Sequence, residues 1–320
     1  MAFPRFPVAQ MATTADDAIR DALLDLSGRR TAKPRTEVGM VAAVTLRGLP
    51  NVEAAWQFLL RPLSCSLHLA GVFCHGSPQI QFNAGGTTRC ELADLLIVVD
   101  RKSRRSTTRK AALIQAKMAA RAGWVLLTGP SSRRQLVLYQ TWPLFKFMDT
   151  KSYGTQSFDL STNIADQSGT FGVIDRHFRA SPGVPPVWTQ HPAYPTPKQI
   201  TNEPTLGQFL AELADGRRRG FGRSCVAGGR DDWSRVVDLL LDVTYKQVFR
   251  YAPDFGANAQ PRGMSRIAFL SGRSQFDRRS KSLVGGGWRP PYDDFQIVED
   301  DPPRGLSVLH VSLEMDDDYK

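Results

Sequence analysis

The chain has 320 residues, 42% of them hydrophobic, and its 41 Lys and Arg outnumber its 31 Asp and Glu to give a net charge of +10. A chain of this length and apolar content can bury one large core or two small ones, which indicates a globular protein and excludes an intrinsically disordered one. The basic balance favours a polyanionic partner, nucleic acid first, although a basic protein can also have no such partner.

The N-terminal segment and the cysteines indicate the compartment. The first 26 residues soon turn charged and lack the apolar stretch of a secretory signal, and no apolar run approaches the roughly 20 residues of a membrane span. The four cysteines lie far apart without a C-x-x-C pair, so the sequence indicates neither a zinc knuckle nor a disulfide framework. We therefore expect a cytoplasmic protein without membrane association.

Helices and strands follow one another along the first 180 residues. Apolar residues at helical spacing predict amphipathic helices, and short runs of β-branched and apolar residues bounded by turns predict strands. In chain order the predicted elements are helix 15–27, a helix capped by Asn51 and ended by Pro62, strands 67–73, 78–82, 91–99 and 111–119, helix 131–145 and strand 169–178. The alanines of 111–119 suit a helix as well as a strand.

A proline-rich stretch divides the remainder of the chain. Its composition is typical of a linker or an extended surface loop. Two strongly periodic helices and a final strand candidate follow it. We expect four parts: an N-terminal helical extension over 1–45, a core over 46–180, the proline-rich linker over 181–205, and a C-terminal helical or α+β region over 206–320.

Three polar side chains fall inside segments that otherwise look buried. Side chains alternate faces along a strand, so Gln115 and Lys117 share one face of their strand. If this strand pairs as a symmetric hairpin with the preceding one around the basic turn 101–110, Asp94 faces Lys117, with Gln115 one step along. The sequence thus predicts that a carboxylate, an amide and an amine converge on one face of a sheet.

This convergence has two interpretations, because buried charges cost several kcal/mol unless they are paired or bind an ion. The structural one is an Asp94–Lys117 salt bridge, which contributes less than about 1 kcal/mol when exposed. The functional one is a site for a hard cation such as Mg²⁺, which takes carboxylate and amide oxygens, with a lysine that stabilises charge developing at a phosphate.

An acid near one strand followed by an acid-x-Lys triplet on the next resembles the PD-(D/E)xK nuclease superfamily, and Gln115-Ala116-Lys117 is similar to its Q-x-K variant. The resemblance covers roughly residues 50–178, where the predicted order of helices and strands matches the α-β-β-β-α-β core of that superfamily. It implies an α/β fold: a restriction-endonuclease-like core with a mixed central β-sheet flanked by helices, to which an α-rich C-terminal region is added.

The resemblance also implies roles for individual residues. Asp94 matches the metal-binding Asp, Gln115 the position usually held by an acid, and Lys117 the catalytic Lys. A neutral Gln weakens metal affinity, so the site needs another acid. The first helix of the superfamily often supplies a Glu, which makes Glu53 the candidate, whereas Glu91 lies on the opposite face of its strand and reaches the site only through a bulge or by lying at the mouth of the strand. Each Glu also suits a helix first turn or a solvated strand end.

The implied catalytic set is therefore Asp94, Gln115, Lys117 and Glu91, with Mg²⁺ or Mn²⁺ held by Asp94, Gln115 and Glu53. Runs of basic residues suit sequence-independent contacts with phosphates, although each also suits a solvated turn. The expected nucleic-acid-binding residues are Arg101, Lys102, Arg104, Arg105, Arg133, Arg134, Arg217, Arg218 and Arg219, and Arg109 and Lys110 extend the first run.

The function that the resemblance implies is a metal-dependent DNA endonuclease of a bacterial anti-phage defence or restriction type, acting as a homo-oligomer or under a regulatory partner protein. One rival is a catalytically inactive nucleic-acid binder with the same fold. The other is a protein-interaction module in which Asp94 and Lys117 form only a salt bridge.

Overall fold

A computed structural model gives the structure of the chain. It describes residues 4–28, 37–73, 78–103, 106–119, 129–161, 168–175, 188–191, 204–217, 221–251, 267–270 and 307–315.

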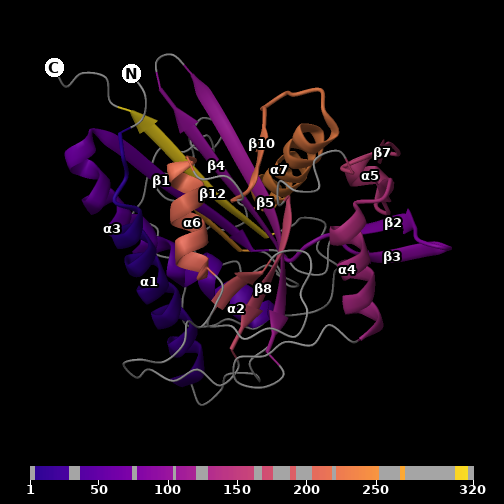
Figure 1. Ribbon diagram of the computed structural model, residues 1–320, viewed down its shortest axis with the longest axis horizontal. Coiled ribbons are helices and arrows are strands. Elements are labelled where there is room, and N and C mark those ends of the chain that lie inside the picture. Colours follow the sequence, from indigo (N-terminus) through magenta and orange to yellow (C-terminus); the bar gives the residue numbers. More distant parts are fainter. Residues whose placement is uncertain are drawn as a thin grey trace.

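A mixed eight-stranded sheet forms the centre of the molecule (Figure 1). Seven strands follow the order β11-β1-β12-β4-β5-β8-β9, and β10 pairs with the far end of β5. Their bounds are β1 Cys65–Phe73, β4 Leu95–Lys102, β5 Thr107–Met118, β8 Gly169–Ile174, β9 Trp188–His191, β10 Arg223–Cys225, β11 Ile267–Leu270 and β12 Ser307–Met315. β12 runs parallel to β4, and β5 runs parallel to β8, whereas β4 and β5 form an antiparallel hairpin.

The strands at the centre are apolar on both faces. Leu95 to Val99 in β4 are all buried, as expected when helices or a second layer cover both sides of a sheet. β8 carries Gly172 where the Trp188 ring of β9 lies: a Cβ there would come within 2.4 Å of the ring nitrogen, so the close approach of the ring requires glycine.

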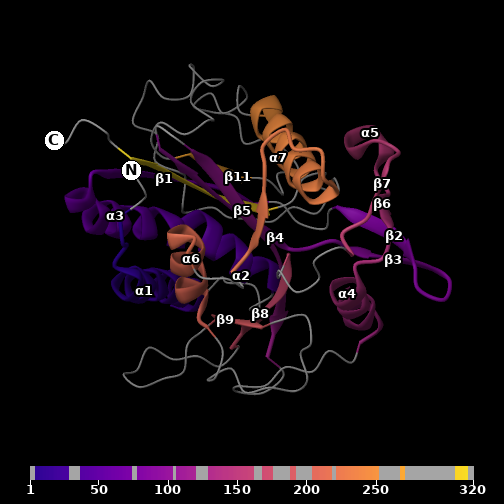
Figure 2. The same cartoon turned by 45° about the horizontal axis from the view of Figure 1, so that its top comes forward.

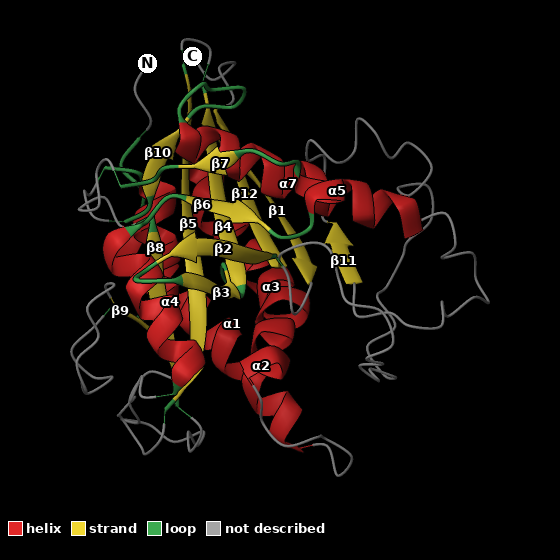
Figure 3. Cartoon of the chain, turned by 90° about the vertical axis from the view of Figure 1, so that its right-hand side faces the viewer, coloured by secondary structure: helices red, strands yellow, loops and turns green. Residues whose placement is uncertain are grey.

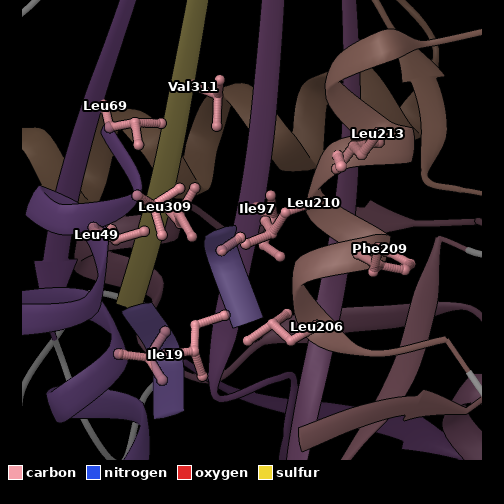
Figure 4. Packing of buried hydrophobic residues seen from close by; sticks show 14 of the residues in the cluster. Ile19, Leu49, Leu69, Ile97, Leu206, Phe209, Leu210, Leu213, Leu309 and Val311 are labelled. Carbon is pink, nitrogen blue, oxygen red and sulfur yellow. The ribbon is translucent and has the colours of Figure 1, made fainter. Parts of the chain in front are cut away.

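Helices cover one face of the sheet. They are α1 Val8–Gly28, α2 Glu37–Ala43, α3 Leu49–Leu60 and α6 Leu206–Asp215, and a π-helical turn, Val44–Gly48, joins α2 to α3. Figure 4 shows Ile19 of α1, Leu49 of α3 and Leu206 of α6 packed toward strand residues such as Ile97 and Leu309. α6 lies late in the sequence, and it packs against the N-terminal helix α1.

The other face carries helices and a second, smaller sheet. The helices on this face are α4 Pro130–Thr141, α5 Thr150–Tyr153 and α7 Asp232–Tyr251. A short 3-10 turn, Arg61–Leu63, is not part of this face and directly follows α3. The second sheet has the order β3-β2-β6-β7, with β2 Gln79–Asn83, β3 Thr87–Glu91, β6 Phe145–Phe147 and β7 Ser157–Phe158. Figure 2 shows the β2–β3 hairpin projecting beside α4, on the side of the molecule away from α1 and α3.

These observations confirm the expected α/β class, a mixed sheet flanked by helices, and correct several details. The predicted strand 91–99 is wrong as one element, because the chain leaves the second sheet at Glu91 and enters the central sheet at Leu95. α3 continues directly from the π-helical turn, so Asn51 does not cap it. The stretch 181–205, expected to be a linker, contains β9, and most of its other residues lie outside the described part.

None of the helices in the described ranges combines the length and the apolar character that a bilayer crossing requires.

Candidate metal and catalytic site

Asp94 lies where the chain passes from the second sheet into the central sheet. Its backbone N–H donates to the carbonyl of Ile114 at 2.9 Å, which extends the β4–β5 ladder by one residue. The register pairs Leu95 with Ile114, so Asp94 lies beside Gln115, and the expected pairing with Lys117 is wrong. The hairpin closes at Ser103 and Ser106, whose backbone groups bond at 2.9 Å, and this off-centre turn moves the register by two residues. A register shift of two residues leaves Asp94 on the predicted face of the sheet, because side chains alternate faces along a strand.

The carboxylate of Asp94 is bonded to β5. Its Oδ2 accepts the backbone N–H of Ala116 at 2.8 Å and also the side-chain amide N–H of Gln115. Asp94 and Gln115 thus form a direct side-chain pair that bridges the entry to β4 and the end of β5, as the strand parity predicts.

The amide oxygen of Gln115 has no hydrogen-bond partner among the described residues, although the side chain is only 1% exposed. Because the amide nitrogen faces the Asp94 carboxylate, the oxygen is left as a buried acceptor. An unsatisfied buried polar atom costs about 1–3 kcal/mol and calls for a partner, which the described residues do not supply. A cation or a water molecule would fill that place.

Lys117 follows on the same face of β5, and its partner is an acid that the sequence did not indicate. Its Nζ lies 3.5 Å from Oε2 of Glu37, the first residue of α2. The second Glu37 oxygen accepts the backbone N–H of Met118 at 3.1 Å. Glu37 therefore holds the end of β5 and orients the amine of Lys117 at the same time.

The pKa of Asp94 is raised to about 7, chiefly by burial and to a smaller extent by the nearby Glu37 carboxylate, while Lys117 and the Ala116 N–H act in the opposite direction. Asp94 is therefore poised to bind a proton or a cation near neutral pH. Perturbation by burial together with a specific charged partner is typical of functional sites.

Of the two glutamates expected to complete the site, Glu53 lies elsewhere, whereas a role for Glu91 stays a prediction. Glu53 is buried on the α1–α3 side of the sheet, where its Oε1 accepts from the backbone N–H of Leu69 and from Gln57, both at 3.2 Å. β12 separates β1, the strand of Leu69, from β4, and the helix-borne acid that lies beside Lys117 is Glu37. Glu91 is half-buried at the end of β3 in the second sheet.

Helix α4 contributes two buried polar residues, of which Tyr139 lies near Asp94. Tyr139 is buried and donates its hydroxyl to the carbonyl of Leu92 at 2.9 Å, which fixes the chain two residues before Asp94. Burial raises the pKa of Tyr139 well above its usual value, and the Asp94 carboxylate adds to this effect. Gln135, one helical turn earlier, is also buried, and its amide oxygen lacks a partner among the described residues. The i, i+4 spacing of Gln135 and Tyr139 is the sequence pattern that could have identified them, but the same spacing is typical of a helix face that packs against a core.

The basic residues divide into paired and unpaired groups. Lys102 forms an ion pair with Glu314 at 2.6 Å, Arg217 lies 3.8 Å from Asp215, and Arg101 stacks over the ring of Phe6. Arg133 and Arg134 are exposed near the start of α4. Arg104, Arg105, Arg218 and Arg219 lie outside the described residues.

Arg109 corrects the interpretation of the 101–110 run as a phosphate-binding turn. It is buried, it donates two parallel hydrogen bonds to Asp100 at 2.6 and 2.8 Å, and it reaches Asp238 of α7 at 2.9 Å. His310 of β12 contacts the same Asp100 carboxylate at 2.9 Å. Arg109 therefore ties the hairpin to α7 and is not available to nucleic acid.

Comparison of this chain with protein-family models, curated proteins and solved structures finds no match. Within the described ranges, no group of three His, Cys, Asp or Glu side chains is placed to hold a metal ion. The available donor set is instead mixed: the Asp94 carboxylate, the unsatisfied Gln115 oxygen and, beside Lys117, the Glu37 carboxylate. All of these are oxygen ligands, which suits a hard cation such as Mg²⁺ or Mn²⁺ and disfavours a thiolate- or imidazole-binding metal.

Proposed function

We propose that the chain is a metal-dependent endonuclease that hydrolyses phosphodiester bonds in DNA, with a restriction-endonuclease-like core. The observation that carries this proposal is the buried Gln115 oxygen, which has no partner in the described part of the chain, lies adjacent to the Asp94 carboxylate and is on the same strand face as Lys117. A salt bridge alone would not account for it, since Asp94 is bonded to Gln115 while Lys117 is paired with Glu37.

Each residue has a distinct role in this proposal. Asp94 and Gln115 would hold Mg²⁺ or Mn²⁺ through oxygen atoms, and Glu37 is the acid nearest to complete the set. When bound, such an ion stabilises negative charge on phosphate oxygens and favours a deprotonated water. Lys117 presents an ammonium group to the same place, where it donates to a phosphate oxygen or to the attacking water. Glu37 keeps that amine oriented in the absence of substrate.

The biological setting is part of the proposal. The resemblance to Q-x-K nucleases supports a bacterial anti-phage defence or restriction role, and the net charge of +10 supports a polyanionic substrate. The cytoplasm is where such an enzyme would meet DNA, either as a homo-oligomer or under the control of a partner protein.

Plasmid cleavage tests the proposal. The wild type is incubated with supercoiled plasmid in Mg²⁺, in Mn²⁺ and in a chelator, beside Asp94→Asn, Lys117→Met and the control Arg20→Met. Arg20 is a partly exposed cation of α1 that is paired with Asp17 and belongs to none of the predicted sites. We expect metal-dependent cleavage by the wild type and the control, and a loss of at least 100-fold in both site variants, since removing one transition-state donor costs 10²–10³ in rate.

Three results would contradict the proposal. Cleavage that survives both substitutions would place the chemistry elsewhere. A wild type that binds plasmid but cuts it with neither metal would favour the catalytically inactive nucleic-acid binder, and one that neither binds nor cuts would favour the protein-interaction module.

A further inference from the structure

The second sheet presents a flat polar face away from the core. Its alternate residues Ile80, Phe82, Cys90, Phe145, Phe147 and Phe158 are buried against α4, α5 and α7. The opposite face displays the other residues of the strands, and Figure 3 looks onto this sheet in front of the central one. The outward residues are Gln79, Gln81 and Asn83 of β2, Thr87, Arg89 and Glu91 of β3, Lys146 of β6 and Ser157 of β7.

The register places two cations of this face in one row. Gln81 pairs with Arg89 on one side and with Lys146 on the other, and Lys146 pairs with Ser157. Since neighbouring strands lie about 4.8 Å apart, Arg89 and Lys146 stand roughly 10 Å from each other across β2. Across the four strands, the row therefore consists of a cation, an amide, a second cation and a hydroxyl group, from Arg89 to Ser157.

These cations differ from several others on the surface because they have no anionic partner among the residues that the structure describes. Lys102, Arg20 and Arg235 are each paired with a carboxylate. Arg89 and Lys146 are exposed and form no ion pair within the described part of the chain, and the same holds for Arg133 and Arg134 of α4, the helix that packs against β3. The one carboxylate that the described strands place on this face is Glu91, at its end.

The aromatic side chains of the sheet indicate which kind of nucleic acid would fit. Proteins that bind single strands stack bases on exposed aromatic rings. Here the aromatic residues of the second sheet are all buried, with Phe82 at 3% and Phe158 at 0% exposure. A face of amides, hydroxyls and unpaired cations without exposed rings suits the sugar-phosphate backbone of a duplex.

The face and the candidate site are close along the chain. β3 ends at Glu91, and Asp94 follows three residues later. At about 3.3 Å per extended residue, Arg89 and Asp94 are separated by at most roughly 17 Å, which corresponds to about five base pairs of B-form DNA.

We propose that the outer face of the second sheet, centred on Arg89, Gln81 and Lys146, is a docking surface for the backbone of double-stranded DNA. This inference rests on the proposed function in one respect, that the docked duplex is the substrate of the Asp94 site. The hairpin turn at Gly85 and Gly86, both with positive φ, lets the face extend beyond the core without a side chain in the way.

The test compares Arg89→Gln/Lys146→Gln with the matched control Arg5→Gln/Arg61→Gln. The control removes two cations that are likewise exposed and outside any ion pair in the described part, but that lie at the α1 and α3 side of the molecule. Binding to a fluorescent 20-base-pair duplex is measured in chelator across a salt series, together with thermal unfolding to establish that each variant is folded. Plasmid cleavage in Mg²⁺ gives KM and kcat.

We expect the Arg89→Gln/Lys146→Gln variant to bind at least tenfold more weakly than the wild type, with a salt-dependence slope lower by about two, because each phosphate contact contributes about 0.9 to the slope. KM should rise by a similar factor while kcat stays unchanged, and the control should match the wild type.

The outcomes separate the two proposals. Unchanged duplex binding by a folded Arg89→Gln/Lys146→Gln variant would overturn the docking surface and leave the nuclease intact. Weakened binding with no cleavage by any form would support the surface and overturn the nuclease. Tighter binding of the single strand or of duplex RNA would overturn the assignment to double-stranded DNA, and a wild type that binds none of the three would overturn both proposals.

Discussion

The side-chain pair Asp94 and Gln115 defines the site at the scale of single residues. Gln115 holds the carboxylate with its amide nitrogen and leaves its oxygen unsatisfied. A Glu at this position would place two carboxylates side by side and require a cation or a proton at all times, because like charges at this distance raise each other's pKa. The neutral amide therefore allows the fold to form without a metal ion.

The pKa of Asp94 gives a prediction for stability. With burial raising the folded pKa to about 7, well above its unfolded value, the folded protein retains a proton that the unfolded chain has lost. In chelator, the free energy of unfolding of the wild type should therefore decrease as the pH rises from about 4 to about 7, compared with that of Asp94→Asn. The slope should be at most roughly 1.4 kcal/mol per pH unit. Urea unfolding at several pH values measures the difference, and parallel profiles would contradict it.

Part of the site could be predicted from the sequence. The shared face of Gln115 and Lys117 follows from the two-residue period of a strand, and that period also kept Asp94 on the correct face when its register was wrong by two residues. Glu37 could not be found in this way. Its position beside Lys117 depends on how α2 packs at the end of β5, and no local pattern encodes that contact.

At the scale of elements, a buried ion network attaches α7 to the β4–β5 hairpin. Arg109 binds Asp100 within the hairpin and Asp238 of α7, and Asp238 also accepts the backbone N–H of Gly228. Burial raises the pKa of Asp100, but the bonds from Arg109 and His310 outweigh it and hold that pKa below its ordinary value. Asp100 therefore stays ionised at neutral pH, where its stabilising contribution is present, and the contribution is lost in acid.

Replacing Arg109 should cost stability rather than DNA affinity. Arg109→Met leaves Asp100 buried without its principal partner, and breaking such a pair costs about 3–5 kcal/mol. The matched change Lys102→Met, in the exposed pair with Glu314, should cost less than about 1 kcal/mol. Urea unfolding compares the two, and Asp100→Asn/Arg109→Met should recover part of the loss. Equal costs for the two single variants would show that Arg109 is not buried in this network.

The sequence pattern identified most of the long elements but not the short ones. The periodic helices and the apolar strands carry enough residues for their period to be read, whereas β6, β7 and β10 have two or three residues each. The segment 91–99 was misread because two strands of different sheets follow each other with only three residues between them.

At the scale of the whole molecule, the strand from the end of the chain completes the centre of the sheet. β12 lies between β1 and β4 and pairs with both, and α6 packs on α1. The order of strands in the sheet is a long-range property that no local pattern specifies, which is why the sequence suggested a separate region over 206–320. The expected domain boundaries stay a prediction.

A fragment experiment tests how far the two halves depend on each other. Residues 1–205 alone leave β1 and β4 without the strand that joins them and expose the apolar face under α6, so we expect an insoluble or unfolded fragment. Co-expression with 206–320 should restore soluble protein. A 1–205 fragment that is soluble and unfolds cooperatively would support an independent nuclease core.

The most direct test of the proposed metal site is to locate the ion itself. A crystal grown with Mn²⁺ and measured for anomalous scattering should show one peak within about 2–2.5 Å of the Asp94 carboxylate and the Gln115 amide oxygen, a normal distance for oxygen ligands of such cations. The peak should disappear in Asp94→Asn. A well-ordered crystal at saturating Mn²⁺ that shows Gln115 still bonded to Asp94 and no ion beside them would contradict the account.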